Sequence, residues 1–187
     1  MRNSIKFLVS AGILLGTVSC AATVVTGAAA GTATATDSRG GGNVIKDQDI
    51  EHKVNNVLDA QVPSGSYTVA SYAKNVLLAG QVPNAGDKAK AEAAAHSVVG
   101  VKKVWNYLTI GETEGVSAVT QDAYITSAAK TRLIAQKEVN ANNIKVVTSN
   151  GVVYLLGHKS GKPAGIRAGI AGIKEIDGVK SVVNLIR

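Results

Sequence analysis

The hydrophobic positions of this chain form a pattern that occurs twice. Each copy opens with apolar residues three or four positions apart, which is the spacing of the buried face of an α-helix. These residues are Ile50, Val54, Val57 and Leu58 in the first copy, and Ile125, Ala129 and Leu133 in the second. Asp49 in the first copy, and Thr120 or Asp122 in the second, are residue types that cap a helix N-terminus. We therefore expect the first helix of each copy to begin near these residues.

Short runs of aliphatic and β-branched residues follow each helix and predict two strands in hairpin order. The strands cover residues 67–72 and 76–79 in the first copy, and 144–148 and 152–156 in the second. Asn150-Gly151 separates the second pair, and this dipeptide favours a tight hairpin turn. A second helix is expected near residues 87–98 and 163–173, with Pro163 in its first turn, and a last strand over residues 101–110 and 179–186.

Direct residue matches show that the two copies share one fold. Residues 76–80 match residues 153–157 at an offset of 77, and residues 100–108 match residues 178–186 at an offset of 78. A repeat of this length predicts two tandem domains, over residues 47–111 and 119–187. The order α-β-β-α-β places two helices on one face of a three-stranded mixed sheet, so the predicted fold class is α+β.

The last strand of the first copy carries two aromatic residues whose face is ambiguous. Alternation places Trp105 and Tyr107 on one face, and Val104 and Leu108 on the other. If Val104 and Leu108 face the helices, the aromatic pair lies on the open face of the sheet and can contact the other domain or a protein partner. In the alternative phase, the aromatic pair lies in the core of its own domain.

The N-terminus has the layout of a bacterial lipoprotein signal. Basic residues and an apolar run over residues 7–18 precede Cys20, the single cysteine of the chain. This predicts a signal peptide over residues 1–19, a diacylglyceryl group on Cys20, and a flexible tether over residues 20–46. Two alternatives remain: cleavage after Ala21 to give an unlipidated product, or retention of the uncharged residues 7–36 as a membrane anchor.

Positive charge is concentrated in the second copy. The chain has a net charge of +7, but residues 49–110 contribute +1 and residues 120–187 contribute +6. Aromatic residues make up only 4% of the chain, so its cores must be aliphatic. The second domain is therefore the one expected to meet an anionic surface. Export makes nucleic acid an unsuitable partner.

The repeated motifs resemble those of the BON domain family. They are V-x-L-x-G at the end of the hairpin and G-V-x-x-V-x-N-x-L in the last strand. The start of the mature chain, residues 20–27, is similar to that of the two-BON-domain lipoproteins of Gram-negative envelopes. The resemblance implies a non-enzymatic protein on the periplasmic face of the outer membrane. It also implies binding of anionic phospholipid through the first helix of the second domain, and a role in outer-membrane integrity at division sites.

Five residues of the second domain form the expected lipid-facing surface: Tyr124, Lys130, Arg132, Ile134 and Lys137. On a helix, the side chain of Tyr124 points about 100° away from that of the core residue Ile125, and an exposed tyrosine suits a membrane interface. The three basic residues are expected on the same helix, where each contributes about 1 kcal/mol near an anionic surface. The alternatives are that Tyr124 packs inside the protein and that the basic residues lie on a merely solvated face.

No motif predicts an enzyme, a metal site or a cofactor. His52, His96 and His158 lack the spacing of metal ligands. Gly165, Gly169 and Gly172 lie inside a predicted helix, which indicates close helix packing and not a phosphate loop. The second functional hypothesis is a periplasmic scaffold or stress protein that binds envelope proteins through its sheet faces. The oligomeric state is left open.

Overall fold

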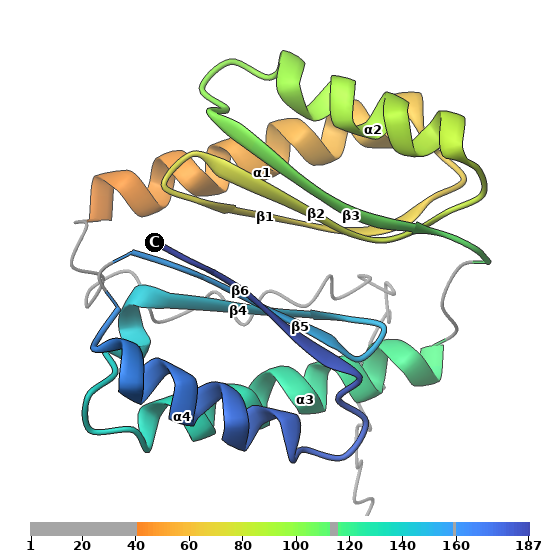
Figure 1. Ribbon diagram of the computed structural model, residues 1–187. Coiled ribbons are helices and arrows are strands. Elements are labelled where there is room, and N and C mark those ends of the chain that lie inside the picture. Colours follow the sequence, from red (N-terminus) through yellow and green to blue (C-terminus); the bar gives the residue numbers. More distant parts are fainter. Residues whose placement is uncertain (1–40, 113–115, 159) are drawn as a thin grey trace, which may run out of the picture.

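The computed structural model describes residues 41–112, 116–158 and 160–187, which form two domains of the same topology (Figure 1). Helices and strands follow one another in the order α-β-β-α-β in each domain. The first domain contains α1 (Gly41–Gln61), β1 (Ser66–Tyr72), β2 (Asn75–Val82), α2 (Ala85–Ser97) and β3 (Lys103–Ile110). The second contains α3 (Val116–Ile134), a short 3-10 helix (Ala141–Asn143), β4 (Ile144–Ser149), β5 (Val152–Gly157), α4 (Pro163–Lys174) and β6 (Ser181–Ile186).

Helices α1 and α3 begin earlier than their expected capping residues. The predictions that Asp49 caps α1, and that Thr120 or Asp122 caps α3, are wrong, because each of these residues lies inside its helix. Residues 41–46, expected in the tether, instead form the first part of α1. Pro163 does lie at the start of α4, where its missing N–H has no helical acceptor to lose.

Each domain has a mixed three-stranded sheet with its helices on one face, which confirms the predicted fold class. The hairpin strands pair antiparallel, and the last strand pairs parallel with the second, in the order β1-β2-β3 and β4-β5-β6. Both hairpin turns use left-handed backbone conformations. The φ angles are 51° and 73° at Asn150 and Gly151, and 52° and 65° at Ala73 and Lys74.

A separate aliphatic core lies between the helices and the sheet of each domain. The predicted stripe of α1 is in the first core, with Ile50, Val54 and Leu58 buried and Val57 packed at its edge. The predicted stripe of α3 is fully buried in the second core. Val104 and Leu108 belong to the first core, so the strand phase that places them under the helices is confirmed.

The free faces of the two sheets pack against each other and form a third core between the domains. Figure 1 shows the two sheets stacked between an α1–α2 layer and an α3–α4 layer. Trp105 packs at this interface, and the ring of Tyr107 lies 5.2 Å from the ring of Tyr154 in the other domain. Trp105 and Tyr107 therefore contact the other domain, as predicted for the strand phase in which they lie on the open face of the sheet.

Burial at this interface gives the protein an alkaline limit of stability. It raises the pKa of Tyr154 to about 12 from its usual value near 10, and Tyr107 and Asp122 add to the rise. Above pH 10 the unfolded state loses this proton before the folded state does, so the free energy of unfolding falls as pH rises toward 12. We expect Tyr154→Phe to reduce this fall by about 1 kcal/mol, measured by urea denaturation at pH 8 and pH 11.5. An unchanged fall in the variant would show that Tyr154 titrates normally.

Candidate functional site

The outward side of α3 carries exposed apolar side chains that no other element covers. Tyr124 is 59% exposed and Ile134 is 70% exposed. Since successive helical residues are rotated by about 100°, Tyr124, Ser127, Thr131 and Ile134 lie along one face, opposite the buried stripe. We call these four residues the α3 outer stripe. It contains no charged side chain.

No acidic side chain is exposed anywhere on α3. The single acid of the helix is Asp122, which is 8% exposed. Its carboxylate accepts hydrogen bonds from the backbone N–H groups of Asn150 (2.6 Å) and Gly151 (2.8 Å) at the β4–β5 turn. The negative charge is thus turned inward, and the outer surface of α3 is left neutral or positive.

The equivalent helix of the first domain has the opposite character. When α1 and α3 are aligned by the residues of their buried stripes, Ile50 corresponds to Ile125 and Leu58 to Leu133. The four positions of the α3 outer stripe then correspond to Asp49, His52, Asn56 and Asp59, all exposed. The two apolar positions of α3 are therefore both aspartates in α1. One fold presents an acidic outer helix in the first domain and an apolar one in the second.

The basic residues predicted beside the stripe do not form one cluster. Lys130 and Arg132 point about 160° apart and lie on opposite flanks of the α3 outer stripe. Lys130 is half-buried, and Arg132 is exposed. The prediction that Lys137 lies on the same helix is wrong, because α3 ends at Ile134 and Lys137 lies in the following turn. The positive charges therefore border the stripe on both sides and at its end.

An open hollow of about 1020 Å³ lies where α3 ends and α4 begins. Ile134 and Lys137 line it, together with Lys162 and Pro163 at the start of α4. Lys162 pairs with Glu138 across the hollow at 2.5 Å, and both side chains are largely exposed. The hollow extends the α3 outer stripe toward α4, so two of the five predicted site residues are brought together there.

The glycines of α4 allow close packing against α3 and the turn after it. A Cβ atom at Gly169 would lie 2.9 Å from a methyl group of Leu133, and one at Gly165 would lie 2.9 Å from the Cβ of Glu138. A Cβ at Gly172 would lie 3.8 Å from Arg132. The prediction that this glycine series serves helix packing is confirmed, and it fixes the direction of α3 and hence of its outer stripe.

A pair of buried aspartates is a feature that the sequence prediction missed. Asp47 in α1 does for the β1–β2 turn what Asp122 does for the β4–β5 turn: it accepts from the N–H groups of Ala73 (2.9 Å) and Lys74 (2.8 Å). Each aspartate lies three residues before the first isoleucine of its buried stripe. This shared position could have been recognised in the sequence. It indicates that both aspartates have a role inside their domains and are not helix caps.

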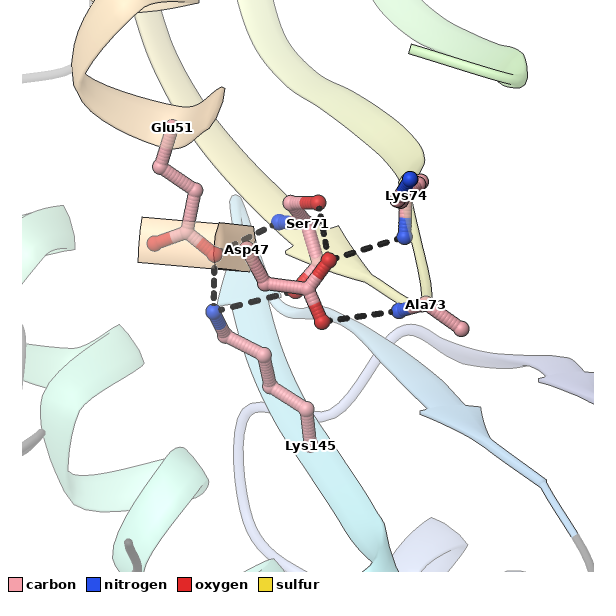
Figure 2. A network of polar contacts seen from close by, with 6 residues as sticks. All are labelled: Asp47, Glu51, Ser71, Ala73, Lys74 and Lys145. Atoms are coloured by element: carbon pink, nitrogen blue, oxygen red, sulfur yellow. Dashed lines mark hydrogen bonds and ion pairs between the residues drawn. The ribbon is translucent and has the colours of Figure 1, made fainter. Parts of the chain in front are cut away.

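Polar contacts lock the two domains together beside the third core (Figure 2). The Glu51 carboxylate in α1 accepts from the Lys145 ammonium group in β4 and from the Ser71 N–H at 2.6 Å. Lys145 also lies 3.5 Å from the Ser71 carbonyl oxygen, and the Tyr72 hydroxyl donates to the Asn143 carbonyl at 2.9 Å. The alternative hypothesis of a scaffold with open sheet faces is wrong in its geometry, because these faces cover each other.

Other predicted features lie outside the site. Cys20, the signal peptide and residues 20–40 of the tether fall outside the described residues. Within residues 41–112, 116–158 and 160–187, no group of three His, Cys, Asp or Glu side chains could hold a metal ion. In the same ranges, no helix combines the length and apolar character needed to cross a membrane.

Comparison with known proteins agrees with the repeated topology. The family model described as "BON domain" matches residues 46–112 and 121–187. The chain is 37% identical over 182 residues to the outer membrane lipoprotein DolP of Haemophilus influenzae, covering 94% of this chain and 93% of that protein. It is 35% identical to a 21 kDa hemolysin of Actinobacillus pleuropneumoniae (80% and 78% covered) and 32% identical to the osmotically-inducible protein Y of Escherichia coli (76% and 73% covered). The chain therefore belongs to the BON domain family and contains two BON domains in tandem.

Proposed function

We propose that this protein is a non-enzymatic envelope lipoprotein whose second BON domain binds anionic phospholipid through the outer side of α3. The observation that carries this proposal is the contrast between the two equivalent helices. The α3 outer stripe has Tyr124 and Ile134 where α1 has Asp49 and Asp59. Aspartates repel an anionic surface, whereas a tyrosine and an isoleucine can enter its interfacial region. Only the second domain is thus suited to lie on such a membrane.

The basic flanks suit a helix that lies parallel to the membrane surface. With the α3 outer stripe facing the lipid, Lys130 reaches sideways to headgroups, and Lys137 does so at the end of the helix. Arg132 points about 120° away from the middle of the stripe, beside Gly172 of α4, and adds to the long-range attraction. Each such charge contributes about 1 kcal/mol near an anionic leaflet. The +6 charge of residues 120–187 adds a longer-range attraction, which salt screens.

Lipidation of Cys20 would complete the attachment, because one acyl-anchored end and one weak lipid-binding surface reinforce each other. We place the protein on the periplasmic face of the outer membrane, in the leaflet that faces the periplasm. Its proposed role is to support outer-membrane integrity, including at division sites. The name of the Haemophilus relative, an outer membrane lipoprotein, supports the location.

Co-sedimentation with vesicles tests the lipid surface. Residues 41–187, which begin at the first residue of α1 and lack the anchor, should be retained by phosphatidylglycerol or cardiolipin vesicles at low salt and released at high salt. Lys130→Glu should weaken retention by about thirtyfold, since a charge reversal at this surface removes about 2 kcal/mol. Tyr124→Ala should weaken it by about tenfold, since it removes the aromatic ring that enters the interfacial region. Their melting temperatures should change little, as surface substitutions cost within about 0.5 kcal/mol.

The matched control is Lys53→Glu on α1, which makes the same charge change on the first domain and should leave retention unchanged. No retention of the unsubstituted protein at low salt would refute the proposal. If Tyr124→Ala melts the fold but binding persists, the tyrosine is a packing residue and the lipid surface lies elsewhere.

A further inference from the structure

Three lysines of the first domain surround one small hollow of about 200 Å³. Lys46 comes from α1, Lys74 from the β1–β2 turn, and Lys102 from the residue before β3. The N–H of Lys102 donates to the carbonyl oxygen of Lys74 at 2.8 Å, which fixes these two residues side by side. Asn43, Asp47 and Ala73 complete the lining. Three lysine residues from distant parts of the sequence therefore line one hollow.

Among the described residues, three lysines and one carboxylate line this hollow. Asp47 is the one acid in the lining, is 4% exposed, and already accepts from the Ser71 hydroxyl at 3.0 Å and from two backbone N–H groups (Figure 2). In the part of the chain that the structure describes, no carboxylate pairs with Lys46, Lys74 or Lys102. The lysines that do form such pairs are Lys53, Lys90, Lys145 and Lys162.

Lys74 lies at a backbone position that favours glycine. Its φ angle is 65°, in the left-handed region that L-residues with a side chain rarely adopt. The equivalent residue of the second domain is Gly151, with a φ angle of 73°. Ala73 in the same turn has a left-handed φ angle of 52°, so the hairpin itself requires this conformation, which glycine adopts with less strain than lysine.

The second domain keeps the equivalent backbone contact, from the Lys180 N–H to the Gly151 carbonyl oxygen at 2.8 Å, but only one of the three lysines. Gln121 and Gly151 replace Lys46 and Lys74, and only Lys180 remains, as the equivalent of Lys102. Its ammonium group donates to the Asn150 side chain at 2.5 Å, and the Gln121 amide donates to the Asp177 carbonyl at 3.2 Å. The cluster of three lysines is therefore specific to the first domain.

We propose that Lys46, Lys74 and Lys102 bind a phosphate group in this hollow. Lysine ammonium groups are strong donors to phosphate oxygens, and three of them can meet several oxygens of a tetrahedral anion. The volume suits a single phosphate group without acyl chains. This group is carried either by a small phosphate ester in solution or by a lipid headgroup. The site goes beyond the lipid surface of α3, because it lies on the other domain.

Calorimetric titration of the full-length protein in a neutral detergent, with inorganic phosphate and with glycerol 1-phosphate, tests the site. We expect saturable binding of one equivalent. Lys74→Gly and Lys102→Gln should each weaken it about tenfold or more, as the loss of a charge-assisted hydrogen bond requires. Lys180→Gln, the same change at the equivalent position of the second domain, should leave it within about twofold. Lys74→Gly should also keep or raise the melting temperature, since it relieves the left-handed lysine.

The absence of saturable phosphate binding would overturn the proposal. It would also be overturned if Lys102→Gln and Lys180→Gln weakened phosphate binding equally, because that result would show a general effect of charge. Tyr124→Ala should bind phosphate as the unsubstituted protein does, so the outcome is independent of the α3 surface. The Tyr124→Ala variant can also be tested for residual retention by phosphatidylglycerol vesicles. If adding Lys74→Gly abolishes this retention, the phosphate group belongs to a lipid headgroup. Binding of the soluble esters without such retention would identify a solute.

Discussion

Replacing Gly80 with alanine is expected to lower the free energy of unfolding by about 3–5 kcal/mol and to unfold much of the first domain. Gly80 has a φ angle of 126°, where a residue with a Cβ atom is strained. It also pairs with Tyr67 in the β1–β2 ladder, and a Cβ would collide with the carbonyl oxygen of Ser66 and lie 2.8 Å from the Cα of Tyr67. Both contacts are with backbone atoms, which cannot move away without breaking the hairpin.

Urea denaturation followed by circular dichroism measures this effect. Gly111→Ala is the matched control, because a Cβ at Gly111 meets no atom within 4 Å; its free energy of unfolding should change by less than about 0.5 kcal/mol. A Gly80→Ala variant as stable as the control would show that β1 can shift away from β2 at low energy, contrary to the pairing described.

Leu133→Ala is expected to destabilise the protein by about 2–5 kcal/mol, whereas the same change at the next residue, Ile134→Ala, should cost almost nothing. Leu133 is 1% exposed and packs in the second core against Gly169 of α4. Its removal leaves a cavity that the closely packed α3–α4 contact cannot fill. Ile134 is 70% exposed, so its side chain contributes little to folding.

The two variants should separate stability from lipid binding. Thermal unfolding should report a lower melting temperature for Leu133→Ala alone, and vesicle co-sedimentation below that temperature should report weaker retention for Ile134→Ala alone. If Ile134→Ala lowers the melting temperature while retention stays intact, Ile134 is a packing residue and α3 does not face the membrane through this stripe.

The tandem arrangement explains how one fold can carry two different surfaces. The helices of each domain cover one face of its sheet, and the other faces bury each other, so α1–α2 and α3–α4 form opposite outer layers (Figure 1). In the proposed arrangement, with α3 on a membrane, the lysine hollow of the first domain is not part of the α3 lipid contact. The interdomain contacts of Lys145 with Glu51 and of Tyr72 with Asn143 fix this relation.

The repeat, the fold class and the buried stripe of each first helix could be predicted from the sequence alone. Those features depend on local periodicity: Ile125, Ala129 and Leu133 can only share a face if the segment is helical, and Asn150-Gly151 favours a hairpin wherever it occurs. The exposed state of Tyr124 was also open to prediction, since its direction on the helix follows from its distance to Ile125.

Which distant residues come into contact is visible only in the folded structure. The local sequence pattern did not predict the first residue of α3 or its end before Lys137, because helix boundaries are not fixed by capping preferences alone. It could not choose the phase of Trp105 either, since a shift of one residue exchanges the two faces of a strand and only contact with the second sheet selects one. Lys46, Lys74 and Lys102 are separated along the chain and share a hollow only because α1, the β1–β2 turn and the start of β3 converge at one end of the domain. Helical and strand periodicity is a property of consecutive residues, whereas a site is a property of the packed fold.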